Sequence, residues 1–189
     1  MRKGHVVPKR GRRPRRLAMA AAWLGGIVVI VAVAGIPVYI YPPSDSTYGV
    51  DAVLVLGPPT GNRIDRAREI SDQNGGASII VSVSPRGQHS SERTKACRSA
   101  DVECLIPDPF TTKGEAELLS ELAAEYGWGS AAVVTEAPQV LRARYVFDRC
   151  SRLDTSVVSV PYSGSFFGLV YQYGYQTAAF AKAFTTGCA

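Results

Sequence analysis

The first candidate for chemistry is a short glycine-containing turn that runs into the start of a predicted helix. Gly57 ends an apolar run, and Arg63 and Arg66 lie just inside the helix that follows. Backbone N–H groups at a helix start, together with arginine side chains, can bind an anion. The turn is neither a Walker P-loop nor G-x-G-x-x-G, and Pro58 and Pro59 lack N–H donors. The alternative is that both arginines are solvated.

Two further segments, 107–115 and 135–144, also follow strand-like runs and lead into helices. Thr112 precedes Glu115 by three positions, which resembles a capping box and would explain both residues without a function. In the other segment Arg142 could turn inward, although an arginine on a helix is usually at the surface. Ligands of parallel α/β sheets bind at the carboxyl ends of the strands, so these are the loops in which we expect a site.

The cysteines indicate disulfides. Four are present, and all follow the apolar N-terminal segment: Cys97, Cys104, Cys150 and Cys188. An even number in an exported domain predicts two bridges, for which three connectivities exist. We favour Cys97 with Cys104, which closes a small loop, and Cys150 with Cys188, which fixes the C-terminus; a free thiol nucleophile is the alternative. No C-x-x-C occurs and His5 and His89 are the only histidines, so no metal site is predicted.

The elements that must position these residues alternate along residues 50–189. Strands are predicted for residues 51–56, 77–83, 102–106, 130–135 and 155–160. Helices are predicted for residues 62–74, 92–100, 113–126, 138–149 and 166–184. This alternation implies an α/β fold, a Rossmann-like three-layer sandwich with a mostly parallel sheet. The last helix is rich in Tyr and Phe, and it either covers a sheet edge or docks a partner or the membrane.

The N-terminal part predicts a membrane anchor. Residues 1–16 carry eight of the 21 Lys and Arg and no acidic residue, whereas the rest of the chain has a net charge of −3, which argues against a nucleic-acid partner. Residues 17–41 are uncharged and long enough to span a bilayer. The basic tail predicts a cytoplasmic N-terminus, with a linker at residues 42–49 and an extracytoplasmic domain at 50–189. A cleaved signal peptide is the alternative, because Ala32 and Ala34 form an A-x-A pattern.

Several of these segments carry a family resemblance over about residues 50–160. The chain resembles the YdcF/SanA-like family, a domain of unknown function, in its actinobacterial membrane-anchored form. The matching segments are DAVLVLG, NRIDRA, PDPFTTKGEAELL and VVT followed by RAR. The resemblance implies an α/β domain with a polar pocket at the strand ends and a role in the cell-envelope barrier. It also implies a nucleotide-like ligand such as S-adenosylmethionine, although no cofactor is established by residue spacing.

The departures from the family pattern limit the expected chemistry. Ser82-Val83-Ser84 replaces the family's S-G-G, and in its T-S-x-x-H-x-x-R-A motif Glu136 stands for Ser and Gln139 for His. A glutamine amide cannot exchange a proton near neutral pH, so an acid–base role at that position is lost. The remaining polar residues could still bind a ligand: Thr112, Glu115, Glu117, Thr135, Gln139, Arg66 and Arg142.

Two functional hypotheses therefore stand. The first is a ligand-binding or interaction module with a degenerate pocket, whose partner is a cell-wall precursor or an envelope protein. The second is an envelope hydrolase or transferase for an anionic or nucleotide-like precursor. In that case Glu115 would be the base, and Arg66 and Arg142 would hold the anionic group.

Overall fold

A computed structural model describes residues 13–188, and the chain divides into two compact units between Gly35 and Ile36. The first unit contains helix α1 (Arg13–Gly35). The segment Leu17–Ile40 is long and apolar enough to cross a membrane, which is compatible with the predicted anchor. Residues 1–12, most of the predicted basic tail, lie outside the described residues. The second unit begins with a π-helical turn, η1 (Ile36–Ile40), and contains the α/β domain.

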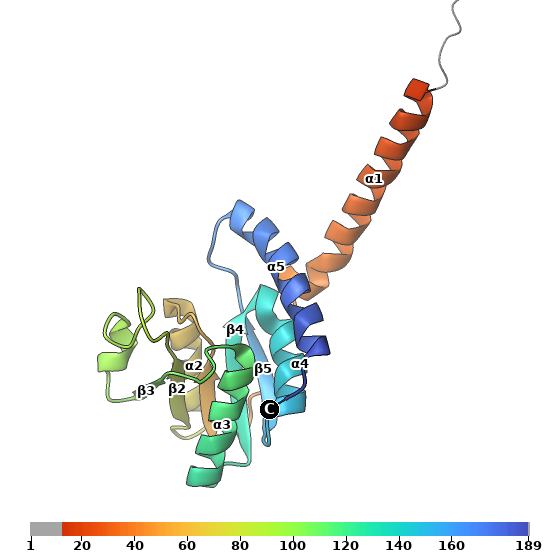
Figure 1. Ribbon diagram of the computed structural model, residues 1–189. Coiled ribbons are helices and arrows are strands. Elements are labelled where there is room, and N and C mark those ends of the chain that lie inside the picture. The colour runs from red at the N-terminus through yellow and green to blue at the C-terminus, as the bar shows by residue number, and fades with distance from the viewer. Residues whose placement is uncertain (1–12, 189) are drawn as a thin grey trace, which may run out of the picture. The chain divides into compact units, whose positions relative to one another are not determined.

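The domain is built on a five-stranded parallel sheet with the order β3-β2-β1-β4-β5 (Figure 1). Its strands are β1 (Ala52–Val55), β2 (Ser78–Ser82), β3 (Val102–Leu105), β4 (Ser130–Glu136) and β5 (Asp154–Val160). Every residue of β1 is buried, because this central strand has neighbours on both sides and helices on both faces. The predicted α/β class with a parallel sheet is confirmed.

Helices cover the two faces separately. The four long helices of the domain are α2 (Gly61–Gln73), α3 (Thr112–Tyr126), α4 (Val140–Cys150) and α5 (Phe166–Thr185). Ile70 of α2 packs with Val53 and Val55 on one face, whereas Leu119 of α3 and Phe147 of α4 pack with the opposite face of the sheet. The alternation of side chains along β1 thus divides the core into two layers. Figure 1 shows α3 and α4 on the same side of the strands.

The strand order reverses between β1 and β4. The chain leaves β1 into α2 on one face, and it leaves β4 into α4 on the other face, so the two loops diverge. A crevice forms outside the carboxyl ends of the strands at such a point, and it is the usual ligand site of this kind of sheet.

Two predicted elements differ from the structure. The helix expected at residues 92–100 is only a 3₁₀ turn, η2 (Lys95–Arg98), because Ala96 is its one buried residue and a longer helix would have no apolar face to pack. Pro138 lies in a 3₁₀ turn, η3 (Ala137–Gln139), that precedes α4.

The disulfides are Cys97–Cys104 and Cys150–Cys188, as favoured from the sequence.

The segment predicted as a linker, residues 42–49, packs along the outer strand β5. The N–H of Asp45 donates to the carbonyl of Val157, and its carboxylate accepts from the N–H of Val157 at 2.9 Å. Ser44 accepts from the N–H of Ser159. This segment occupies the sheet edge that the last helix was expected to cover. Helix α5 packs on α4 instead, where the rings of Tyr145 and Phe180 lie 5.2 Å apart.

Candidate functional site

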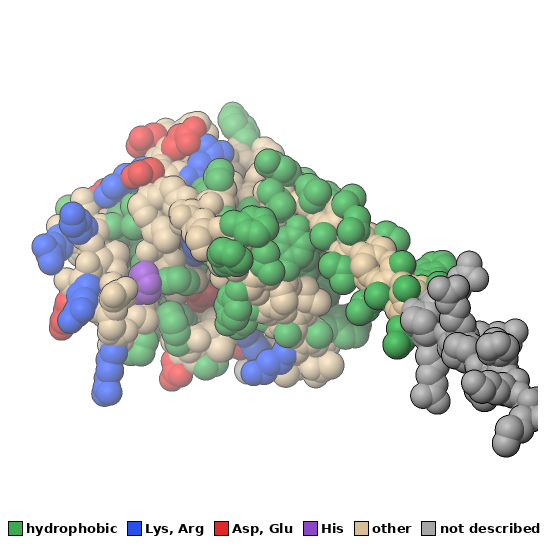
Figure 2. All heavy atoms as spheres, turned by 90° about the horizontal axis from the view of Figure 1, so that it is seen from above, with side chains coloured by type: hydrophobic (Ala, Val, Ile, Leu, Met, Phe, Trp, Pro, Cys, Tyr) green, Lys and Arg blue, Asp and Glu red, His purple; other side chains and the backbone are tan. Residues whose placement is uncertain are grey.

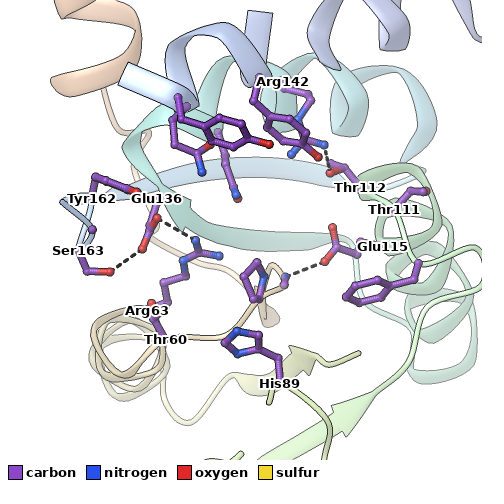
Figure 3. Close-up of a pocket in the computed structure, with 18 residues that line it drawn as sticks. Thr60, Arg63, His89, Thr111, Thr112, Glu115, Glu136, Arg142, Tyr162 and Ser163 are labelled. Atoms are coloured by element: carbon purple, nitrogen blue, oxygen red, sulfur yellow. Dashed lines mark hydrogen bonds and ion pairs between the residues drawn. The ribbon is translucent and has the colours of Figure 1, made fainter. Parts of the chain in front are cut away.

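A cavity of about 600 Å³ lies at the carboxyl ends of the strands, at the point where the strand order reverses (Figure 3). Each strand supplies part of the lining through the segment that follows it. Gly57 comes after β1, His89 after β2, Phe110 after β3, Glu136 ends β4, and Tyr162 follows β5. Five segments that are far apart in the sequence therefore meet in one place, because parallel strands all end at the same side of the sheet.

Arg63 and Glu136 form a buried ion pair on one side of the cavity (Figure 3). The distance from Arg63 Nη2 to Glu136 Oε2 is 3.3 Å, and Arg63 Nη1 donates to the carbonyl of Leu56 at 2.9 Å. Ser163 donates to the other carboxylate oxygen of Glu136. Burial lowers the pKa of Arg63, and the adjacent carboxylate acts in the opposite direction, so the guanidinium stays charged. Glu136 neutralises this charge, which leaves Arg63 less suited to bind an anion than the sequence suggested.

Glu115 faces the cavity from the first turn of α3. It does not belong to a capping box: the N-cap is Thr111, whose hydroxyl accepts from the N–H of Gly114, while Glu115 accepts from the N–H of Gly57 at 2.8 Å. The capping explanation for Thr112 and Glu115 was therefore wrong, because the helix begins one residue earlier than that pairing requires. Burial raises the pKa of the Glu115 carboxyl, and the Gly57 N–H and the two arginines of the cavity partly offset this rise.

The absence of a side chain at Gly57 leaves room around this contact. A Cβ at Gly57 would lie 3.3 Å from the Phe110 ring and from the Ser82 hydroxyl, and 3.4 Å from Glu115 Oε1. The first two distances are shorter than ordinary van der Waals contacts, and the third is at the lower limit of such contacts. A larger residue would therefore require the Phe110 ring and the Ser82 hydroxyl beside Glu115 to shift by a few tenths of an ångström.

Arg142 reaches the cavity from the first turns of α4. Its Nη1 donates to Thr112 Oγ1 and its Nε donates to Gln176 Oε1 at 2.9 Å. Gln176 is the one buried residue of α5, and it donates in turn to Gln172. Both partners of Arg142 are neutral, and no carboxylate lies within ion-pair distance of it in residues 13–188. Arg142 therefore keeps a positive charge that the protein does not neutralise by direct contact. Burial lowers its pKa.

Gln139 replaces the family's histidine, and its side chain is held in place. Thr135 donates a hydrogen bond to Gln139 Oε1 at 2.7 Å, which directs the carbonyl oxygen of the amide toward β4. Gln139 lines the cavity, whereas Thr135 is fully buried behind it. The amide can donate a hydrogen bond to a ligand but cannot transfer a proton.

Three residues predicted for the site do not line the cavity: Thr135 is buried behind it, and Arg66 and Glu117 lie elsewhere. Arg66 is on the outer side of α2, where it forms an ion pair with Glu69 at 2.6 Å, and its side chain is 32% exposed. Glu117 faces a separate depression beside Cys150 and Arg152. Arg66 and Glu117 point away from the cavity because of their positions around the helix axis. The inward positions are taken by Arg63 on α2 and by Glu115 on α3.

Other residues of the cavity were not predicted from the sequence. Glu136 was noted as a departure from the family motif, and its position at the end of β4 could have placed it in the site by the strand-end rule. Tyr171, Gln172 and Tyr175 of α5 also line the cavity. No sequence signal could have placed them there, because their position depends on how α5 packs over η3 and α4.

The fold and cavity define a doubly wound α/β domain with a polar pocket that contains two arginines and two glutamates. Within residues 13–188, no group of three or more His, Cys, Asp or Glu side chains is arranged to hold a metal ion. No protein-family model, curated protein or solved structure matches the chain. The similarity to the YdcF/SanA-like family therefore remains a prediction from the quoted segments.

Proposed function

We propose that this chain is a membrane-anchored cell-envelope protein of the YdcF/SanA-like type, whose domain binds a small ligand with an anionic group and hydrogen-bond donors. The anionic group would contact Arg142, and donor groups such as hydroxyls would contact Glu115. The ligand class would be a cell-wall precursor or another nucleotide-like molecule. Binding would contribute to the envelope barrier from the extracytoplasmic side of the membrane.

The observation that carries this proposal is the contrast between the four charged residues of the cavity. Arg63 and Glu136 neutralise each other at 3.3 Å, whereas Arg142 contacts only neutral partners. Glu115 accepts one N–H from the backbone and is 5% exposed. A buried charge without a charged partner is costly for the protein alone. A ligand with a complementary group would relieve that cost, which supports binding at this place.

S-adenosylmethionine suits the residues of the cavity by their chemistry. Its carboxylate could pair with Arg142 and its ribose hydroxyls could donate to Glu115. The rings of Tyr171 and Tyr175, which line the cavity, offer surfaces for a base to stack on. Other nucleotides and sugar phosphates carry the same groups, an anion for Arg142 and hydroxyls for Glu115. The proposal is therefore for a ligand with both groups, and the experiment must show which of these molecules binds.

The test is a thermal-shift screen of the full chain in detergent against nucleotides, S-adenosylmethionine, sugar phosphates and soluble cell-wall precursors. A ligand at about a hundred times its Kd stabilises a protein by about 2.7 kcal/mol, which raises the melting temperature by several degrees. Arg142→Ala should abolish the shift. Arg66→Ala is the matched control, since Arg66 lies outside the cavity, and it should leave the shift unchanged. Equal shifts in wild type and Arg142→Ala would reject the pocket as the binding site.

The second candidate, a hydrolase or transferase, is favoured by the environment of Glu115. Burial raises the pKa of this carboxyl toward the range in which a glutamate works as a general base. A ligand found in the screen should then be consumed by wild type and by Arg66→Ala but not by Glu115→Gln. Binding without any turnover in wild type would reject the enzyme and keep the binding module.

A further inference from the structure

Helix α5 presents an exposed face of mostly aromatic side chains. The side chains of this aromatic face are 49–83% exposed: Phe166, Phe167, Val170, Tyr171 and Tyr175. Tyr171 and Tyr175 also line the rim of the cavity. Figure 2, which looks onto the α5 side of the domain, shows hydrophobic side chains gathered there. Contiguous exposed apolar surface on a domain usually marks a contact with a protein or a membrane.

The composition of α5 favours lipid over water as its surroundings. Lys182 is the only charged residue in the helix, and it lies in the last turn. Aromatic side chains with one polar end, such as tyrosine, prefer the membrane–water interface, and phenylalanine inserts beside them. A lysine near the end of such a helix can extend its ammonium group toward water while its aliphatic part stays in the interface.

The position of α5 within its own unit favours lipid as the partner of the aromatic face. Tyr39, in the last turn of the candidate span Leu17–Ile40, donates or accepts a hydrogen bond with Thr177 of α5 at 2.7 Å. Its ring lies 4.6 Å from that of Tyr173. Tyr41 and Phe166 also line one shallow depression. The end of the apolar segment is therefore in direct contact with α5, and the surface around this end is where the headgroup layer of a bilayer would be.

We propose that the aromatic face of α5 lies in the interfacial layer of the bilayer that the segment Leu17–Ile40 crosses, on the side of Ile40. This inference rests on the membrane anchoring stated under Proposed function. Because the anchor keeps the helix at the membrane surface, even a weak intrinsic affinity for lipid suffices. The domain is then held with one side against the membrane, instead of moving freely on a flexible connection.

Spin labels on single introduced cysteines test this in the full chain reconstituted in phosphatidylcholine–phosphatidylglycerol vesicles. All four native cysteines form disulfides, so an unreduced protein takes a label only at the new site. Phe167→Cys and Val170→Cys report on the aromatic face, and both positions are exposed, so the substitutions leave the core intact. Glu125→Cys, near the end of α3, is the water-exposed control, and Val29→Cys reports on the anchor.

Collisions with oxygen and with a water-soluble nickel chelate measure the surroundings of each label. We expect the chelate to reach the labels at positions 167 and 170 several-fold less than the label at 125, with oxygen access retained. Chelate access equal to that at 125, while the label at 29 is in the bilayer, would overturn this inference and leave the anchoring intact. Low access to both reagents would indicate a protein contact instead of lipid, and would also overturn it. A water-accessible label at 29 would reject the anchoring itself and this inference with it.

Discussion

Replacement of Arg63 by methionine should strongly destabilise the domain, because it leaves the Glu136 carboxylate buried without its cation. The two charges are 3.3 Å apart, which corresponds to an attraction of about 5 kcal/mol at an effective dielectric constant near 20. The variant also loses the hydrogen bond to the Leu56 carbonyl. The variant also avoids the cost of burying the Arg63 guanidinium, which is 1% exposed in the wild type, and this gain in stability offsets part of the loss. Breaking a buried pair typically costs about 3–5 kcal/mol, and we expect a loss in that range.

The matched control is Arg66→Met on the same helix. The ion pair of Arg66 with Glu69 is shorter, at 2.6 Å, but its side chains are 32% and 55% exposed. Solvent screens such a pair, and its loss should cost about 0–1 kcal/mol. Distance alone would rank the two variants in the opposite order from burial, so the comparison decides which effect dominates.

Urea unfolding of the full chain in detergent gives the free energies. Trp23→Phe serves as the background, so that Trp128 alone reports on the domain. A loss of about 3–5 kcal/mol is a large part of the stability of a typical domain, so Arg63→Met could fail to fold. In that case Glu136→Gln provides a milder variant of the same ion pair. The double variant Arg63→Met/Glu136→Leu should lose less than the sum of the single variants, since no unpaired charge remains. A cost for Arg66→Met equal to that for Arg63→Met, or additivity in the double variant, would refute the reasoning.

Three further predictions concern the disulfides, Glu115 and the glycine at the start of α3. By the loop-entropy relation, removing Cys150–Cys188, with a sequence separation of 38, should cost about 4 kcal/mol, and removing Cys97–Cys104, with a separation of 7, should cost about 2 kcal/mol. Urea midpoints of the two double-serine variants measure these losses, and equal losses would contradict the prediction. Burial raises the pKa of Glu115 above its ordinary value of 4.5, so the folded state holds this proton more tightly and loses stability as the pH rises from 4.5 through the raised pKa. Glu115→Gln should therefore gain stability relative to wild type across that window and then level off, and a constant difference in urea midpoint at all pH values would count against it. A Cβ at Gly114 would collide with the carbonyl of Pro109, so Gly114→Ala should cost about 1–3 kcal/mol in thermal or urea unfolding, whereas Gly61→Ala, which has open space, should be neutral or slightly stabilising.

The strand-end rule located much of the site from the sequence. Glu115, Gln139 and Arg142 follow predicted strands, and all three line the cavity. Their convergence depends only on chain order in a parallel sheet, and hydrophobic runs reveal that order. The apolar segment at residues 17–41 and the alternation of strands and helices were readable for the same reason, since they depend on local composition and spacing.

The direction of each side chain was decided by the tertiary structure. Arg63 and Arg66 both lie near the start of α2, and only the packing of this helix on the sheet turns Arg63 inward and leaves Arg66 in solvent. A shift of one residue in the start of α3 made Thr111 the cap and released Glu115 into the cavity.

The last helix depended even more on long-range contacts. Residues 44 and 45 occupy the edge of β5, so α5 packs on α4 and brings Tyr171 and Tyr175 to a site formed by loops far from them in the sequence. Local sequence determines which elements form, because propensity and hydrophobic period act over a few residues. The competition among surfaces for burial determines which side chains those elements place in the site, and it is settled only when the whole domain packs.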